Sequence, residues 1–214
     1  MKEATPAVRF GWIGGALCLD FVNTVGNHRY RSLDPADKLN GFEDLVRWCA
    51  EAGILQPADQ RDIPKRGALG PGAAARLFKV AVEFRESLYR IFVAVSLKKP
   101  PEESDMKILN QVLAQAPMVL EVQRQNHSFS CVRMSSMLDE AKLLGPIAWS
   151  ASELLTSEQL SSLRECASET CGWLFLDLSK NHSRRWCAMD DCGGREKARR
   201  YYQRKKTAGS SASR

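Results

Sequence analysis

The chain has 214 residues, of which 44% are hydrophobic, and this is enough for one ordinary domain with a small appendage. It contains no run near the roughly 18 apolar residues of a membrane helix and no signal-peptide pattern, so we expect a soluble cytoplasmic protein without a membrane partner. The net charge of +6 lies at one end, because residues 183–214 contain ten Lys or Arg and three Asp or Glu. Such an end is typical of a segment that binds a polyanion, although a solvated basic tail would have the same composition.

Apolar periodicity predicts a mostly helical N-terminal part. Apolar residues recur at steps of three and four in the segments 16–25, 42–49, 73–97 and 102–116. The first of these segments also fits the alternation of a strand, and we favour a helix there. Gly53 is suited to end the second helix, and the Pro- and Gly-rich segment 56–72 predicts a loop.

The pattern changes in the middle of the chain. Segments 118–122 and 129–134 have the character of two strands joined as a hairpin, and helices are expected again at 136–144 and 146–155. The run Thr156-Ser157-Glu158-Gln159 has the spacing of a capping box, which predicts a further helix leading towards Cys166.

Two matched cysteine pairs stand in the C-terminal part. The spacing is Cys-x4-Cys, fifteen residues and Cys-x4-Cys, formed by Cys166, Cys171, Cys187 and Cys192. Four thiolates make the closed tetrahedral site of a structural Zn²⁺, and a short basic segment needs a metal because it cannot build much of a core. We therefore predict Zn²⁺ on these cysteines, with His182 as the one rival ligand and no open position for catalysis.

The other three cysteines, Cys18, Cys49 and Cys131, are isolated in apolar stretches. Since a cytosolic chain argues against disulfides, we expect them to be small buried side chains.

The residues between the two cysteine pairs predict a hairpin. Segment 172–178 has the pattern of a strand, 179–183 that of a turn, and 184–186 that of a returning strand. Such a hairpin would bring Cys171 and Cys187 together at its open end. The second pair then leads into a helix starting near Gly193, which gives a treble-clef-like or ribbon-like finger.

The last helix is strongly basic. On a helical projection Ala198, Tyr201, Tyr202 and the stem of Lys205 share one side, which we expect to pack on the finger, with a basic arc facing outward. Arg and Lys at this density suit phosphates, although a merely solvated cationic helix has the same pattern. The candidate nucleic-acid contacts are Arg184, Arg185, Arg195, Lys197, Arg199, Arg200 and Arg204.

Together these patterns predict an α+β fold in three parts. The first part is a mainly helical domain with a β-hairpin. The second is a small four-cysteine zinc finger that ends in the basic helix, and the third is a flexible tail. The expected ranges are 1–155, 156–206 and 207–214.

The chain resembles known families in its finger and in its N-terminal part. The run from Cys171 to Arg200 resembles the CGNR zinc finger of bacterial proteins, named for a Cys-Gly-Asn-Arg motif that is matched here by Cys192-Gly193-Gly194-Arg195. Segments 17–25 and 48–55 resemble the ABATE domain that precedes this finger. The resemblance implies a bacterial transcription regulator, in some members linked to stress, with zinc on the four cysteines and DNA contact from the finger. Gly194 departs from the family's Asn, which could cap the helix or contact a base.

Three functions compete at this level. The leading one is a DNA-binding regulator whose N-terminal domain senses an effector of unknown chemistry or self-associates into a homo-oligomer. The second is a zinc-stabilised adaptor that binds RNA or protein and has no enzymatic activity. The third is an enzyme in the N-terminal domain, for which the polar candidates, none of them part of a catalytic motif, are Asp20, Asn23, His28 and His127.

Overall fold

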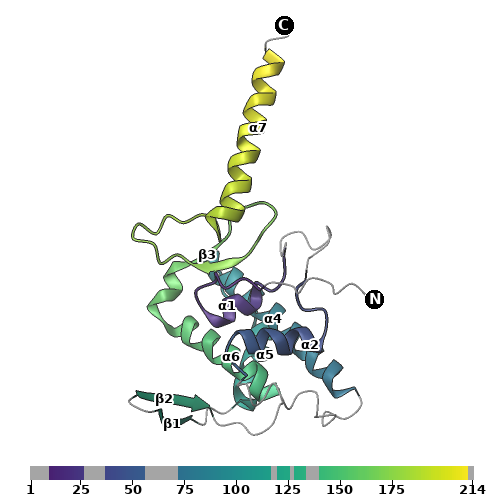
Figure 1. Ribbon diagram of the computed structural model, residues 1–214, viewed down its shortest axis with the longest axis vertical. Coiled ribbons are helices and arrows are strands. Elements are labelled where there is room, and N and C mark those ends of the chain that lie inside the picture. The colour runs from purple at the N-terminus through teal and green to yellow at the C-terminus, as the bar shows by residue number, and fades with distance from the viewer. Residues whose placement is uncertain are drawn as a thin grey trace.

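The computed structural model describes residues 10–26, 37–55, 72–116, 120–125, 128–133 and 140–211. A helical body occupies the centre, and the C-terminal helix α7 (Gly194–Ser211) projects from one end of it (Figure 1). A β-hairpin lies at the opposite end. Within the described residues, no helix has the length and apolar character needed to span a bilayer.

Among the described residues, five helices form the body. They are α1 (Leu17–Val22), α2 (Phe42–Glu51), α4 (Ala73–Ser96), α5 (Glu103–Gln115) and α6 (Glu140–Thr156). The long helix α4 contacts each of the other four, so its apolar stripe organises the core. At its centre the Phe21 ring lies 5.0 Å from the Trp48 ring and 6.4 Å from the Phe84 ring. The first four predicted helices are therefore confirmed; the predicted loop 56–72 lies almost wholly outside the described residues.

Helix α6 corrects the prediction of two helices at 136–144 and 146–155. It runs without a break through Pro146, and residues 136–139 lie outside the described residues. Leu143 and Leu144 before the proline and Ile147 and Ala148 after it are all fully buried. Packing on both sides keeps the helix continuous although the proline removes a backbone hydrogen bond.

The hairpin predicted in the middle of the chain is confirmed. Strand β1 (Leu120–Gln125) pairs antiparallel with β2 (Ser128–Arg133), with Gln125 opposite Ser128. Its Val122 and Phe129 side chains are exposed.

The C-terminal part differs from the prediction in two places. A short 3-10 helix (Glu158–Ser162) and strand β3 (Leu163–Glu165) replace the helix expected towards Cys166. The Ser157 hydroxyl donates back to the Leu154 carbonyl (3.0 Å) and caps no new helix. Strand β4 (Leu174–Leu176) is where a strand was predicted, but it pairs with β3 and not with 184–186.

The choice of partner follows from burial. Leu163, Leu174 and Leu176 are buried in the core of the helical body, whereas Ser183 and Arg185 are exposed. Pairing β4 with β3 therefore buries apolar surface that pairing with 184–186 would leave in water. The two-stranded sheet contacts α1 and α4, and this places the four-cysteine segment directly on the body.

Candidate metal centre and basic helix

The four cysteines of the two pairs meet at one point. Their sulfur atoms lie within 4.8 Å of one another, and all four residues are buried. The Cys171 and Cys187 sulfurs are 3.7 Å apart, and those of Cys187 and Cys192 are 3.6 Å apart. A tetrahedral Zn²⁺ with bonds of about 2.3 Å requires sulfurs about 3.8 Å apart. The cluster therefore has the size and the donor chemistry of a structural zinc site.

Backbone hydrogen bonds shape the first cysteine pair. The Cys166 amide donates to the Trp173 carbonyl (2.8 Å), which continues the β3–β4 pairing, and the Cys171 amide donates to Ser168 (3.2 Å) in a tight turn. Gly172 follows with a φ of 79°, a conformation that glycine adopts without steric cost.

The second pair approaches from the other side. The Ala167 amide donates to the Arg185 carbonyl (2.8 Å), and the Cys187 amide donates to the Cys166 sulfur (3.4 Å). A π-helical turn (Met189–Gly193) then carries Cys192 into the cluster and leads into α7. A Cβ on Gly193 would lie 2.6 Å from the sulfur of the exposed Met189 side chain, which would have to move, whereas Gly194 has room for a side chain.

The pKa shifts of the thiols differ within the cluster, because hydrogen bonding with Cys166 raises the pKa values of Cys171 and Cys187. Hydrogen bonds from the Cys171 and Cys187 thiols lower the pKa of Cys166 well below its ordinary value. Burial instead raises the pKa of Cys18 to about 12 and also raises that of Cys49. Cys18 and Cys49 are buried as predicted, and they are suited to packing and not to metal binding. The side chain of Cys131 lies outside the described ones.

The loop between the pairs is ordered by Asp177. Its buried carboxylate accepts hydrogen bonds from the Ser179 amide and hydroxyl and from the Arg184 amide. The Ser179 hydroxyl is the main cause that lowers the pKa of Asp177. His182 donates its amide to Ser179, and its Nδ1 contacts the Asp177 carbonyl (2.9 Å). His182 is not part of the four-cysteine group.

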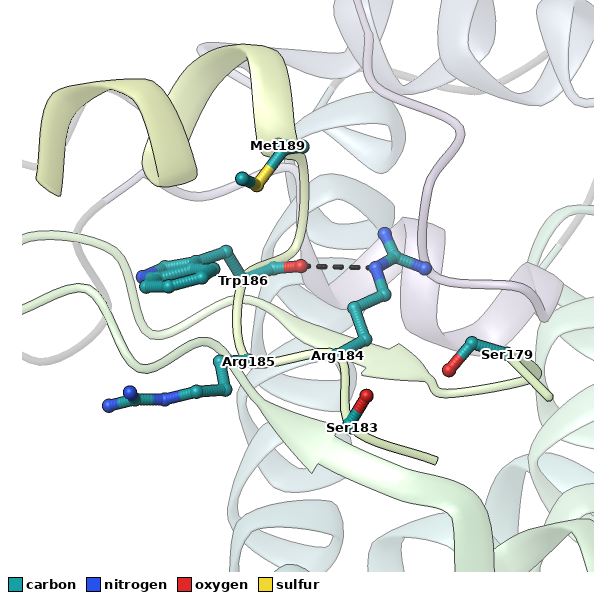
Figure 2. A pocket seen from close by; sticks show the side chains of 6 residues that line it. All are labelled: Ser179, Ser183, Arg184, Arg185, Trp186 and Met189. Carbon is teal, nitrogen blue, oxygen red and sulfur yellow. Dashed lines mark hydrogen bonds between the residues drawn. The ribbon is translucent and has the colours of Figure 1, made fainter. Parts of the chain in front are cut away.

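Arg184 and Arg195, two of the predicted nucleic-acid contacts, bond to groups around the cysteine cluster. Arg184 donates to the Trp186 carbonyl (Figure 2). It also donates to the Cys187 carbonyl, and its guanidinium lies 4.4 Å from the centre of the Phe175 ring. Arg195 donates to the Cys192 sulfur (3.1 Å) and lies 3.3 Å from an Asp191 carboxylate oxygen.

Arg199 joins α7 to the first cysteine pair. It donates to both carboxylate oxygens of Glu169, at 2.5 and 3.1 Å, and to Glu196 at 3.0 Å. Glu196 is buried at the base of α7, and the two carboxylates raise the pKa of Arg199. Arg199 therefore links the helix to the turn between Cys166 and Cys171.

The remaining candidates stay on the surface. Lys197, Arg200 and Arg204 are exposed on α7, and Arg185 is exposed with its guanidinium 5.3 Å from the centre of the Trp186 ring. A shallow depression of about 350 Å³ lies beside Arg185 (Figure 2). It is lined by Ser179, Ser183, Arg184, Arg185, Trp186 and Met189.

The tyrosines of α7 correct the prediction that they pack on the finger. Tyr201 and Tyr202 are 62% and 69% exposed, and their rings contact each other at a centroid distance of 5.7 Å. The reason is the direction of the helix, which leaves the finger at its first turn and runs away from the body (Figure 1).

Two of the four polar candidates for an enzyme site, Asp20 and Asn23, lie in the described residues. The Asp20 carboxylate accepts the Gly14 amide (2.7 Å), and burial raises its pKa to about 6. The buried Asn23 side chain both donates to and accepts from the backbone of Leu174, at 2.8 and 2.9 Å. His28 and His127 lie outside the described residues. Asp20 and Asn23 therefore have structural partners.

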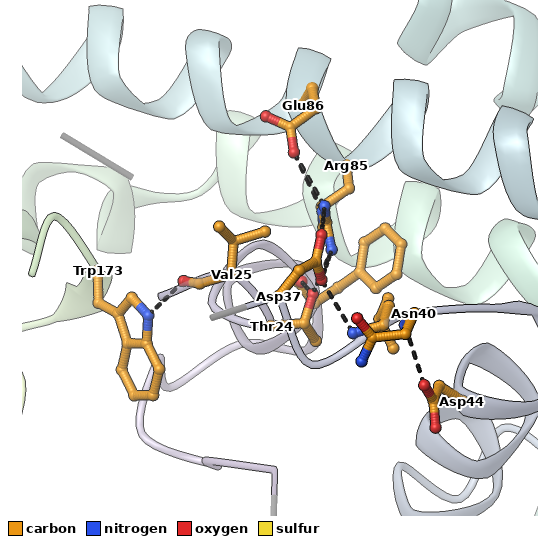
Figure 3. A network of polar contacts seen from close by, with 10 residues as sticks. Thr24, Val25, Asp37, Asn40, Asp44, Arg85, Glu86 and Trp173 are labelled. Atoms are coloured by element: carbon orange, nitrogen blue, oxygen red, sulfur yellow. Dashed lines mark hydrogen bonds and ion pairs between the residues drawn. The ribbon is translucent and has the colours of Figure 1, made fainter. Parts of the chain in front are cut away.

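A polar network that the sequence did not indicate joins α4 to the finger. Arg85 is 1% exposed and donates to both carboxylate oxygens of Asp37, at 2.8 and 2.6 Å, and to the Thr24 hydroxyl (Figure 3). The next residue, Val25, accepts the indole N–H of Trp173 (2.7 Å), two positions after Cys171. The sequence signal that could have indicated this network is Arg85 itself, a charged residue within the apolar stripe of α4.

Comparison with known families agrees with this architecture. Residues 15–158 match the ABATE family, whose description is "putative stress-induced transcription regulator". Residues 162–205 match the CGNR zinc finger. The chain belongs to the ABATE family. It carries a CGNR zinc finger, and its four-cysteine cluster is the Zn²⁺ centre of that finger. A search of the curated proteins found no match.

Proposed function

We propose that this ABATE-family chain is a transcription regulator that contacts DNA through α7. The observation that carries the proposal is a row of exposed cations, Lys197, Arg200 and Arg204, on a helix that projects from the metal centre. A projecting helix of this kind can approach a groove of duplex DNA without a clash from the body. Arg185, at the base of the helix, extends the same charge.

Zinc has a structural role in this proposal. Cys166, Cys171, Cys187 and Cys192 are the ligands, and four thiolates leave no coordination position for water. The metal fixes the two cysteine turns against each other and thereby fixes the base of α7. Cys187→Ser should lose the bound zinc and loosen the finger, and elemental analysis of the purified chain measures the loss.

The helical body has the complementary role. We propose that it senses an effector or mediates self-association, and that it performs no catalysis. The structural partners of Asp20 and Asn23 support this division, since they occupy the polar groups that an enzyme would need.

Salt dependence of DNA binding tests the proposal. If four cations reach phosphates, log affinity should fall against log salt with a slope of about −4. Arg200→Ala together with Lys197→Ala should flatten the slope by about two and weaken binding to all sequences. Lys107→Ala and Lys142→Ala on the body serve as the matched control.

The opposite result has a defined meaning. If the chain binds duplex DNA no more tightly than a scrambled peptide of the α7 composition does, the DNA proposal is wrong. Binding of RNA or of a protein partner in the same assay would then support the adaptor function, for which the exposed Tyr201 and Tyr202 offer apolar contact.

A further inference from the structure

The arginine of the Cys192-Gly193-Gly194-Arg195 motif faces the metal centre. Arg195 lies in the first turn of α7, and its terminal nitrogen is 3.1 Å from the Cys192 sulfur, within hydrogen-bond distance for a sulfur acceptor. Its side chain is 58% exposed, so the guanidinium lies at the surface beside the cluster.

A cation beside the cluster would stabilise its negative charge. Zn²⁺ with four thiolates has a net charge of −2, and thiolates that lack hydrogen-bond donors are readily protonated and released. The Cys187 amide already donates to the Cys166 sulfur. Among the side-chain contacts found for the described residues, Arg195 is the one cation that donates to a sulfur of the cluster.

We propose that Arg195 is a positioning residue of the zinc centre, holding the Cys192 thiolate by an N–H···S hydrogen bond and tying the start of α7 to the metal. Its neighbour on the helix, Arg199, ties the same turn to Glu169 beside the first cysteine pair. The two arginines thus fix α7 at two points on the finger.

A competing explanation is the ion pair of Arg195 with Asp191. Both side chains of that pair are more than half exposed, and their closest atoms are 3.3 Å apart. Exposed pairs contribute little, typically about 0 to 1 kcal/mol. If the ion pair were the purpose of Arg195, its contact with sulfur would be incidental, and the experiment must separate the two.

The rate of zinc release from the full chain tests the proposal, with a chelating dye in excess as the probe. Arg195→Met keeps an unbranched side chain but removes every donor, and it should release zinc about 10- to 100-fold faster than the unaltered chain. Arg200→Met, the same change one and a half turns further along α7, should leave the rate unchanged. Asp191→Asn should not accelerate release.

Three results would overturn the proposal. The first is an equal rate of zinc release from Arg195→Met and Arg200→Met. The second is that Asp191→Asn accelerates release as much as Arg195→Met does. The third is an unchanged thiolate-to-metal absorption band when Co²⁺ replaces zinc in the Arg195 variant. Should Arg195→Met fail to fold, Arg195→Lys against Arg200→Lys decides, because lysine keeps the charge but loses the fixed geometry of the guanidinium. Faster release from Arg195→Lys alone is the expected result.

One further arm rests on the proposed DNA function. Arg200→Met should reduce the salt slope of DNA binding by about one, whereas Arg195→Met should leave it unchanged in zinc-saturated protein. Absence of DNA binding would reject the proposed function, but the zinc-release comparison would still decide the role of Arg195.

Discussion

Arginines of this chain serve different purposes that their position in the sequence does not reveal. Arg85 is buried and neutralised by Asp37, Arg184 supports the backbone of the second cysteine pair, and Arg195 contacts a cluster sulfur. Arg200 is exposed on the same helix as Arg195. At the scale of single residues, the partner within hydrogen-bond distance decides the role, because a guanidinium in a bidentate pair is no longer available to a phosphate.

The raised pKa of Asp20 predicts that the free energy of unfolding depends on pH. Burial raises its pKa to about 6, so in the pH range from about 4 to 6 the folded chain holds a proton that the unfolded chain has lost. The free energy of unfolding should therefore fall as the pH rises through this window, and the loss should be complete above it.

The test of Asp20 is denaturation over a pH series. Asp20→Asn keeps an oxygen that can accept the Gly14 amide but cannot ionise, so this variant should lose the fall between about pH 4 and 6. Glu43→Gln, at an exposed position in the first turn of α2, is the control and should retain the fall. An identical pH profile for Asp20→Asn and the unaltered chain would contradict the assignment.

The elements meet at a seam between α1 and the finger. Asn23, one residue after α1, hydrogen-bonds to both the backbone amide and the backbone carbonyl of Leu174 in β4. The Val25 carbonyl accepts the indole N–H of Trp173. The Leu176 amide donates to the Gly14 carbonyl (2.8 Å), so the seam is bonded on both sides of α1. The bonds of Asn23 are buried and join residues 151 positions apart, so they tie the finger to the helical body.

Removing Asn23 tests the seam. Asn23→Ala leaves the amide and the carbonyl of Leu174 buried without partners, and it should cost about 2 to 4 kcal/mol of unfolding free energy. Urea denaturation of the zinc-loaded chain measures the loss. Asn40→Ala is the matched control, because Asn40 is exposed, and it should change the free energy by less than about 0.5 kcal/mol. Equal effects of the two substitutions would contradict the importance of the seam.

At the scale of the molecule, the finger supplies part of the core of the helical body. Leu163, Leu174 and Leu176 lie in one cluster with residues of α1, α4 and α6. The body and the finger therefore share apolar surface, whereas the outer part of α7 extends into solvent (Figure 1). The expected boundary at residue 155 stays a prediction, and the apolar cluster contains residues from both sides of it.

Two truncations compare these parts. A chain that ends at Leu155 loses three buried leucines and the Asn23 partner, so it should melt at a clearly lower temperature, expose apolar surface and bind a hydrophobic dye. A chain that ends at Arg200 keeps the cysteine cluster and both arginine contacts of α7, and its melting temperature should stay within about 3 °C of the full chain. A chain ending at Leu155 that melts like the full chain would show that the finger contributes nothing to the core.

The sequence by itself determined the features that depend on local spacing and on the chemistry of one residue type. Apolar steps of three and four located α4 and α5, because helix periodicity is a property of near neighbours. The paired cysteines identified a zinc finger, because tetrahedral thiolate coordination needs two short turns. The excess of basic charge in residues 183–214 was also visible in the sequence.

Only the tertiary structure decided which distant groups meet. The partner of β4, the bonds of Asn23 to Leu174 and the exposure of Tyr201 all depend on where the body and the finger contact each other. Arg195 and Arg200 share one helix and one residue type, yet only the placement of the cysteine cluster distinguishes them. The physical reason is that burial and hydrogen bonding are set by neighbours in space, and a contact across 151 positions leaves no periodic trace in the sequence.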